Sequence, residues 1–224
     1  MLLYHSNQTP KNKRKMSQIH IALDIETLST RPTAAIISIA AKCFTFDKEP
    51  QPMPLGVFCK PVNATTCAMY HGFTFDQDTI DFWAKQPDDA KRMYIQDADV
   101  AVSIRHALLS LTENYKSACN LGTGQRPLIW CQGTDFDIAI LRNAFRAVTG
   151  KDAPWPHTDV RDSRTFIHAL AALVRPDVAD PYSIIPKNPD WNPHDPLSDC
   201  DQLIWNVRHL VNEFHARMLP AGSL

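Results

Sequence analysis

An apolar run near the N-terminus carries two acidic residues, and their spacing constrains this chain more than any other feature. The run spans residues 19–27, reads IHIALDIET, and places Asp24 and Glu26 two positions apart. Apolar and β-branched residues in such a run are typical of a buried strand. Residues two apart on a strand point to the same side, so we expect the two carboxylates to lie together.

Two adjacent carboxylates repel each other unless a cation lies between them. Hard divalent cations prefer oxygen ligands, so a metal site is one interpretation of Asp24 and Glu26. A strand that ends in two solvated acids is the other interpretation. Matching acids elsewhere in the chain would favour the metal site.

The composition is that of one globular domain without a strong overall electrostatic field. The chain has 224 residues, a hydrophobic fraction of 44% and a formal net charge of -1. This length is enough for one substantial core, and any surface that binds nucleic acid would have to be local. No apolar run reaches the ~18 residues that span a bilayer, so we expect no membrane attachment.

The cysteines are scattered, with no C-x-x-C pair, and most of them lie in apolar runs. This pattern favours reduced, buried thiols in a cytoplasmic protein over disulfides or a zinc site. The six are Cys43, Cys59, Cys67, Cys119, Cys131 and Cys200.

The first residues differ from the rest of the chain. Residues 1–17 are polar and basic and show no hydrophobic periodicity. We expect a disordered basic arm here, followed by a single domain over residues 18–224. An arm that binds phosphate is the alternative. Met16 stands directly before the first strand, so it is a second candidate, beside Met1, for the start of translation.

The next segments predict a sheet. Residues 34–46 are apolar and rich in isoleucine, as expected of a central strand, and residues 57–60 predict a shorter one. The short connections favour an antiparallel meander with the first strand. Residues 127–131 (PLIWC) predict a further buried strand.

Between and after these strands the pattern is helical. Residues 76–93 predict short helices broken at Pro87, and residues 98–118 have the spacing of an amphipathic helix. Trp83 is either a core residue or a platform on which a base stacks. The proline-rich residues 175–193 predict an ordered loop.

Further acids follow a predicted strand at residues 132–137, which read QGTDFD and pass through a glycine turn into a helix. Acidic side chains at a helix N-terminus are electrostatically favourable. This effect explains the presence of one acid, Asp135 or Asp137, and the other is free to face elsewhere. A second helix is expected to open over residues 159–164, with a further acid at Asp159.

The last predicted helix begins after His194. Asp195 is a good N-cap and Pro196 a good first helical residue. Asp199 then falls between apolar positions, where a lone carboxylate is costly to bury. A bound metal would offset that cost.

These motifs, in this order, resemble those of the DEDDh 3′→5′ exonucleases, the group that contains RNase T, oligoribonuclease and the proofreading subunit of the bacterial replicative polymerase. The D-x-E-T motif is present as residues 24–27, the Phe-Asp motif as residues 133–137, and H-x4-D as residues 194–199. The segments FDQDTIDFWAKQPDDAKRM and WCQGTDFDIAILRNAF are most similar to the small exoribonuclease-type members of mycobacteria and phages.

The resemblance implies an α/β protein with an RNase H-like fold, in which helices flank a mixed central β-sheet. It also implies two divalent cations, Mg²⁺ or Mn²⁺, held by carboxylates, and a two-metal mechanism. Histidine side chains have an ordinary pKa of about 6.5, so His194 would deprotonate the attacking water. The implied metal ligands are Asp24, Glu26, Asp137 and Asp199.

In the second motif, Asp137 is preferred to Asp135 as a ligand because it follows Phe136. Gln132 departs from the asparagine that many relatives carry there. For contacts to the terminal nucleotide the candidates are Thr27 and Leu28. Weaker ones are Trp83 and Arg164.

The implied activity is 3′→5′ hydrolysis of RNA or DNA 3′ ends, with release of nucleoside 5′-monophosphates. An exoribonuclease is favoured, and a DNA-directed exonuclease is the alternative. The sequence also leaves open a catalytically silent nucleic-acid-binding module of the same fold and a different metal-dependent phosphoesterase. Since several relatives are dimers, a homodimer is open as well.

Overall fold

The computed structural model describes residues 17–47, 56–87, 100–121 and 124–218. The predicted basic arm lies outside these residues except for Ser17, and so does Met16. Two helical predictions also lie partly outside the described residues. They are the last part of the short helices predicted over residues 76–93, and the first two residues of the helix predicted over 98–118.

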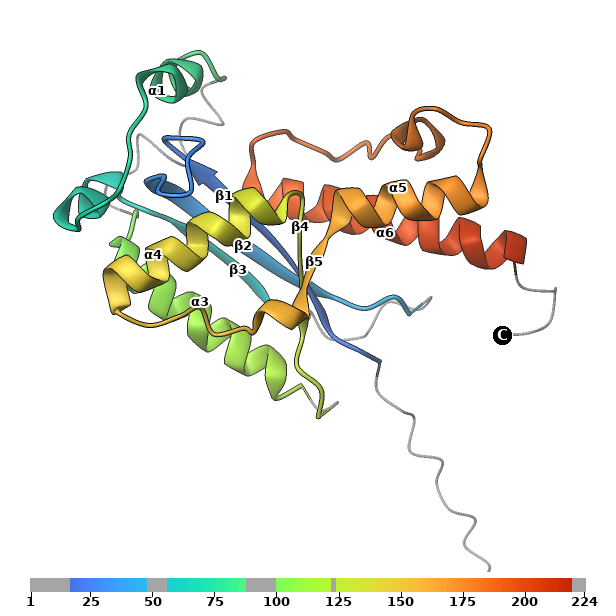
Figure 1. The fold of residues 1–224 in the computed structure, drawn as a ribbon, viewed down its shortest axis with the longest axis horizontal. Helices are drawn as coiled ribbons and strands as arrows, with labels where there is room; N and C mark the ends of the chain where they lie inside the picture. The colour runs from blue at the N-terminus through green and yellow to red at the C-terminus, as the bar shows by residue number, and fades with distance from the viewer. Residues whose placement is uncertain (1–16, 48–55, 88–99, 122–123, 219–224) are drawn as a thin grey trace, which may run out of the picture.

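The described residues form one mixed five-stranded sheet with the order β3-β2-β1-β4-β5 (Figure 1). The predicted antiparallel meander is confirmed: β1 (His20–Thr27) pairs with β2 (Ile36–Phe44), which pairs with β3 (Val57–Pro61). On the other side of β1, β4 (Leu128–Cys131) and β5 (Val160–Asp162) run parallel to it. The first strand is therefore central.

Strand β5 was not predicted, since we expected residues 159–164 to open a helix. Instead Asp159 ends a 3-10 turn, η4 (His157–Asp159), and β5 follows it. Helix α5 (Ser163–Val174) then begins with Asp162 as its N-cap, which accepts the backbone N–H of Thr165 at 2.8 Å. A strand of three residues gains its hydrogen bonds from its neighbour β4, so its own side-chain pattern is a weak signal.

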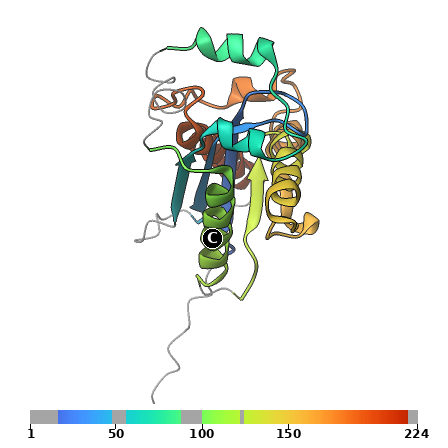
Figure 2. The ribbon, with the colours of Figure 1, turned by 90° about the vertical axis from the view of Figure 1, so that its left-hand side faces the viewer.

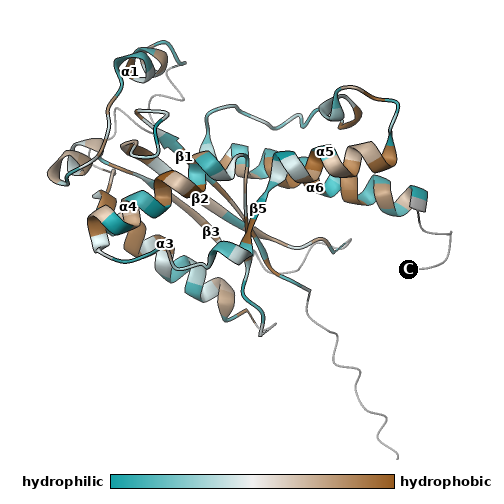
Figure 3. Cartoon of the chain, in the orientation of Figure 1, coloured by the Kyte–Doolittle hydropathy of each residue, from teal (hydrophilic) through white to brown (hydrophobic). Residues whose placement is uncertain are grey.

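Helices cover both faces of the sheet (Figure 2). One apolar cluster joins β1 with α3 (Ile104–Cys119) and α4 (Ala139–Thr149), while a second joins the opposite face with α5 and α6 (Pro196–Met218). Figure 3 shows the strands in hydrophobic colours between helices that carry both hydrophobic and hydrophilic bands. Among the described residues, none of the helices combines the length and the hydrophobicity that a membrane-spanning segment requires.

Alternate residues of β1 belong to the two apolar clusters, because successive side chains of a strand point to opposite faces of the sheet. Ile21, Leu23 and Ile25 are buried towards α3 and α4, whereas Ala22 is buried towards α5 and α6. Asp24 and Glu26 share the side of Ala22. Both acids of the first motif therefore face the layer that contains α6.

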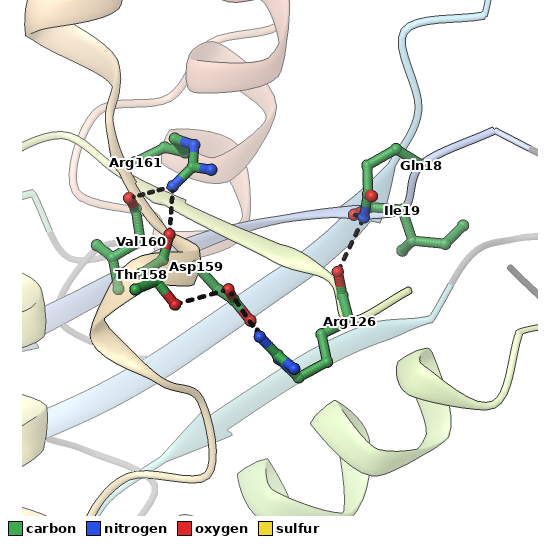
Figure 4. Close-up of polar contacts among 7 residues, drawn as sticks. All are labelled: Gln18, Ile19, Arg126, Thr158, Asp159, Val160 and Arg161. Carbon is green, nitrogen blue, oxygen red and sulfur yellow. Dashed lines mark hydrogen bonds and ion pairs between the residues drawn. The ribbon is translucent and has the colours of Figure 1, made fainter. Parts of the chain in front are cut away.

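An ion pair fixes the start of β4 to the turn before β5 (Figure 4). Arg126 donates from Nε to Oδ2 of Asp159 at 2.6 Å, and this hydrogen bond lowers the pKa of the Asp159 carboxyl. The side chain of Gln18 also donates to the backbone carbonyl of Arg126 at 2.9 Å. These contacts tie the residues that precede β1, β4 and β5 together at one end of the sheet.

At the opposite end, helix α1 (Gln77–Ala84) stands beyond the sheet, near the end of β1 (Figures 1 and 2). Trp83 donates its indole N–H to the carbonyl of Thr27 at 2.9 Å. The backbone N–H of Asp76, just before α1, donates to the carbonyl of Leu28 at 2.8 Å. Helix α1 is thus fastened to the residues that follow the two strand acids.

Candidate active site

Strand β1 places two acids beside small side chains. Asp24 lies opposite Ala40 of β2, and Glu26 lies opposite Ser38. The pairing of the two strands is irregular between Glu26 and Thr27. Bulges and irregularities of this kind are frequent beside active sites because they change where a side chain points.

The first turn of α6 supplies a third acid. Asp195 caps this helix, since its Oδ1 accepts the backbone N–H groups of Leu197 and Ser198, both at 3.0 Å. The next residue after Asp199, Cys200, donates from its thiol to the carbonyl of Ala22 at 3.6 Å, so the helix packs directly on β1. One carboxylate oxygen from each of Asp24, Glu26 and Asp199 lies within 4.8 Å of the other two.

Asp137 comes from the other side of β1. Strand β4 pairs with β1 only at residues 20–22, and the chain then leaves the sheet through Gly133 into a π-helical turn, η3 (Thr134–Ile138). Asp137 is buried in this turn, whereas Asp135 is exposed. The group of three convergent carboxylates does not include Asp137, although its charge acts on Asp24 and Glu26.

Each of these carboxyls has a raised pKa. For Asp24, burial is the main cause, followed by the charges of Asp137 and Glu26. Burial and the charge of Asp199 raise the pKa of Glu26 to about 8. Burial raises the pKa of Asp137 to about 7, against backbone hydrogen bonds from Asp137 itself and Ile25 and the charge of Arg164. Burial also raises the pKa of Asp199.

One further observation bears on a cation. The Oδ2 atom of Asp24 is buried and has no hydrogen-bond partner among the described residues. A buried, unpaired carboxylate oxygen is costly, and a divalent cation would both pair this oxygen and favour the ionised form of its neighbours. The set of oxygen donors therefore fits Mg²⁺ or Mn²⁺.

His194 ends the loop before α6 and adopts a left-handed backbone conformation, with φ of 65°. Its backbone N–H donates to Oδ2 of Asp199 at 2.9 Å, and its Nδ1 lies 3.9 Å from Oε1 of Glu26. The imidazole packs edge-on against Phe82 and Trp83 of α1, with ring centroids 5.2 and 6.0 Å away. The side chain is 42% exposed, so solvent reaches it.

A pocket of about 630 Å³ opens beside the acids, between the end of β1, helix α1 and the His194 loop. Its wall contains one acid of the group, His194 and two aromatic rings of α1, together with polar side chains of the loop after β1 and of α1. The residues are Glu26, Thr27, Thr30, Arg31, Asp76, Gln77, Asp78, Thr79, Phe82, Trp83, Phe136 and His194.

The candidates for substrate contacts lie in different surroundings. Thr27 lines the pocket, while Leu28 is not among the lining residues and packs against the core. Trp83 also lines the pocket but is only 2% exposed, which favours its interpretation as a core residue. Arg164 is exposed in the first turn of α5, with Nη1 3.4 Å from the position that a Cβ on Gly133 would take.

Three aromatic residues at the site were not singled out from the sequence. Phe82 is 41% exposed and lines the pocket with Phe136. Trp191 donates its indole N–H to Oδ1 of Asp199 at 2.8 Å. Phe136 lies within the second motif and Phe82 precedes Trp83, a candidate for nucleotide contact, so both had a sequence signal. Trp191 lies in a loop without periodicity.

Comparison with solved structures supports the fold. Cell-death related nuclease 4 matches with a TM-score of 0.58 at 14% identity, over 88% of this chain and 64% of that chain. E. coli exonuclease I in complex with a dA16 oligonucleotide matches with a TM-score of 0.51 at 15% identity, over 90% of this chain and 41% of that chain. The chain thus spans less than two thirds of either protein, and the likeness confirms the RNase H-like fold.

Sequence comparison gives the family. No curated protein sequence matches the chain. The model of the 3′-5′ exoribonuclease Rv2179c-like domain matches residues 19–211, which include every residue of the candidate site. The chain belongs to the Rv2179c-like 3′-5′ exoribonuclease domain family.

Proposed function

We propose that this protein is a metal-dependent 3′→5′ exonuclease that acts on RNA. It removes nucleotides from the 3′ end of single-stranded or overhanging RNA and releases nucleoside 5′-monophosphates. The observation that carries the proposal is the convergence of carboxylates from β1 and α6 within 4.8 Å, at the edge of a pocket that also contains His194.

The carboxylates are the proposed ligands of two divalent cations, Mg²⁺ or Mn²⁺. Asp24, Glu26 and Asp199 form the convergent group, and Asp137 approaches it from η3. The burial of Asp137 and the exposure of Asp135 favour Asp137 as the fourth ligand. When bound, such ions supply the positive charge that stabilises the attacking and leaving oxygens of a phosphodiester.

His194 is the proposed general base. Its imidazole takes the proton of the attacking water, whose oxygen forms a bond to phosphorus while the bond from phosphorus to the 3′-oxygen breaks. The 3′-oxygen leaves with the electron pair of that bond and takes a proton from solvent, which gives a 3′-hydroxyl on the shortened RNA. Two observations support this role: Nδ1 lies 3.9 Å from Oε1 of Glu26, and the side chain is exposed enough to meet water and RNA. The rings of Phe82 and Trp83 restrict the orientation of the imidazole.

The pocket is the proposed site of the 3′-terminal nucleotide. Phe82 and Phe136 offer aromatic surface on which a base stacks, and Thr27 lies beside Glu26 in the same wall. Trp83 forms a buried part of this wall, and Leu28, which follows Thr27 in the chain, packs against the core. Arg164, beside Gly133, is the proposed partner of a backbone phosphate.

RNA is preferred to DNA because the family to which the chain belongs is described as exoribonuclease. A DNA-directed exonuclease is the second candidate, because E. coli exonuclease I, which shares the fold, forms a complex with a dA16 oligonucleotide. Discrimination between the two requires contacts to the 2′-hydroxyl.

Matched RNA and DNA oligonucleotides, labelled at the 5′ end and incubated with Mg²⁺, test the proposal. Stepwise shortening of the RNA from its 3′ end, abolished in Asp24→Asn, is the expected result. Faster shortening of the DNA would support the second candidate. Internal fragments would indicate an endonuclease, and binding without cleavage would indicate a silent module, so either would refute the proposed activity.

We also propose that residues 18–224 act as a single domain in the cytoplasm. All six cysteines of the sequence are free thiols in the structure, which suits a reducing compartment. A homodimer stays a prediction. Light scattering of the purified chain, which gives its molar mass in solution, tests it.

A further inference from the structure

The carboxylate of Asp199 is held from the solvent side by an indole. Its Oδ1 accepts the N–H of Trp191 at 2.8 Å, while its Oδ2 accepts the backbone N–H of His194 at 2.9 Å. Each carboxylate oxygen has two lone pairs, so both oxygens keep one for another partner. The two hydrogen bonds therefore fix the plane of the carboxylate and leave it able to bind a cation.

Other hydrogen bonds besides that of Trp191 hold its loop in place. The loop is tied to α6 at two other points: Trp205 donates its indole N–H to the carbonyl of Pro186 at 2.8 Å, and the N–H of Asn192 donates to Oγ of Ser198 at 2.7 Å. Trp191 itself is 46% exposed, so burial of its ring contributes little. What distinguishes Trp191 is the donor that it aims at Asp199.

We propose that Trp191 is a positioning residue that holds Oδ1 of Asp199 in the orientation required for metal binding. This inference rests on the proposed function, in which Asp199 is a ligand. Groups that hydrogen-bond to a metal ligand fix its orientation, and their loss typically lowers metal affinity or activity about 10–100-fold. Because Oδ2 of the same carboxylate binds the backbone of His194, Trp191 also links the base to the metal ligands.

The test is Mn²⁺ binding without RNA, measured by titration calorimetry on the purified full-length chain. Trp191→Phe keeps an aromatic ring and removes the donor, so we expect Mn²⁺ affinity to fall about 10–100-fold. Trp205→Phe is the matched control, because it removes an indole hydrogen bond of the same length from the same loop without touching a carboxylate. It should bind Mn²⁺ like the wild type.

RNA cleavage at increasing Mn²⁺ concentrations provides a second readout. The activity of Trp191→Phe should recover at high Mn²⁺, because only the affinity for the ion is reduced. Unchanged Mn²⁺ affinity in Trp191→Phe would overturn the inference, even if cleavage is slow, since the ring would then act on RNA. Equal losses of Mn²⁺ affinity in both variants would also overturn it, because general anchoring of the loop would explain them.

The two proposals fail separately. If the wild type binds Mn²⁺ but does not shorten RNA, the proposed function is wrong, and weaker Mn²⁺ binding by Trp191→Phe still supports the role of Trp191. If the wild type shortens RNA and Trp191→Phe binds Mn²⁺ normally, only the inference fails. Circular dichroism melting of each variant verifies that the compared proteins are folded.

Discussion

Nδ1 of His194 lies 3.9 Å from Oε1 of Glu26, although Glu26 is near the end of the first strand and His194 ends the last long loop. The ring reaches this place because its backbone is left-handed and its edge rests on Phe82. A non-glycine residue with φ of 65° carries a conformational cost of about 1–3 kcal/mol. Such strain persists where surrounding contacts determine the conformation, here the hydrogen bond to Asp199.

Removal of this imidazole should slow cleavage without loss of metal. In His194→Ala we expect kcat to fall about 10²–10⁴-fold, the usual contribution of a general base, while Mn²⁺ affinity stays within a factor of about three because the ring is not among the proposed ligands. His168→Ala, in an exposed histidine of α5, is the control. A His194→Ala enzyme with the wild-type pH–rate profile would contradict the role of base.

The choice between the two acids of η3 can be tested directly. Asp137→Asn and Asp24→Asn should each reduce kcat at least ~10³-fold, because they remove ligands for ions worth several kcal/mol in the transition state. Asp135→Asn, two residues from Asp137 but exposed, should retain activity within about threefold. The reverse ranking of the Asp135 and Asp137 variants would transfer the ligand role to Asp135.

The raised pKa of Glu26 predicts a pH-dependent stability of the metal-free protein. Unfolded Glu26 loses its proton near its ordinary pKa of 4.5, whereas in the folded protein it does so at about 8. Over this interval the folded state binds more protons, so its stability falls as the pH rises. Compared with Glu26→Gln, the metal-free wild type should therefore melt at progressively lower temperatures between pH 5 and pH 8.

Addition of Mg²⁺ is the control for this melting experiment. Saturating Mg²⁺ should diminish the difference from Glu26→Gln at pH 8, because the cation favours the ionised carboxylates. Burial lowers the pKa of His20 to about 4, which destabilises the folded protein at acid pH, but both proteins carry this residue and its effect cancels. A constant difference in melting temperature across the range would contradict the prediction.

A side chain at Gly133 should strain the turn that contains Asp137, because L residues rarely adopt its backbone conformation. This residue has φ of 144°, and a Cβ would lie 3.4 Å from Nη1 of Arg164. Gly133→Ala should reduce the free energy of unfolding by about 1–3 kcal/mol and reduce kcat, since the carbonyl of Gly133 accepts the N–H of Asp137. Urea unfolding and kcat under native conditions measure the two effects.

Gly150→Ala separates strain from function. Gly150 ends α4 with φ of 69° and has nothing within 4 Å of the Cβ position. An alanine at this left-handed position should lower the free energy of unfolding by about 1–2 kcal/mol. Because Gly150 lies away from the proposed metal ligands, kcat should not change. If kcat falls equally in Gly133→Ala and Gly150→Ala, lower stability explains both losses and the turn has no specific effect on activity.

The parts of the fold that local pattern determines could be predicted from the sequence. The alternation in β1 placed Asp24 and Glu26 on one side, and the structure has them facing α6. The cap at Asp195 predicted the start of α6 and therefore the position of Asp199 in its first turn. The order of strands β1 to β3 followed from their short connections.

What depends on distant partners could not be predicted. Strand β5 has two charged residues among its three and forms because β4 offers free backbone groups beside it. For Trp83 the sequence offered both a core position and a stacking platform, and its hydrogen-bond partner, the carbonyl of Thr27, lies in another element. The bond from Trp191 to Asp199 joins an irregular loop to a helix, and neither segment alone indicates it.

The packing of α6 on β1 has a consequence for how the protein is made. Asp24 and Glu26 leave the ribosome early, whereas His194, Asp199 and the thiol of Cys200 that contacts Ala22 are synthesised much later. A nascent chain therefore lacks Asp199, one of the three convergent carboxylates, until α6 emerges and docks against the first strand. The proposed nuclease would therefore gain its activity only in a late step of its own synthesis.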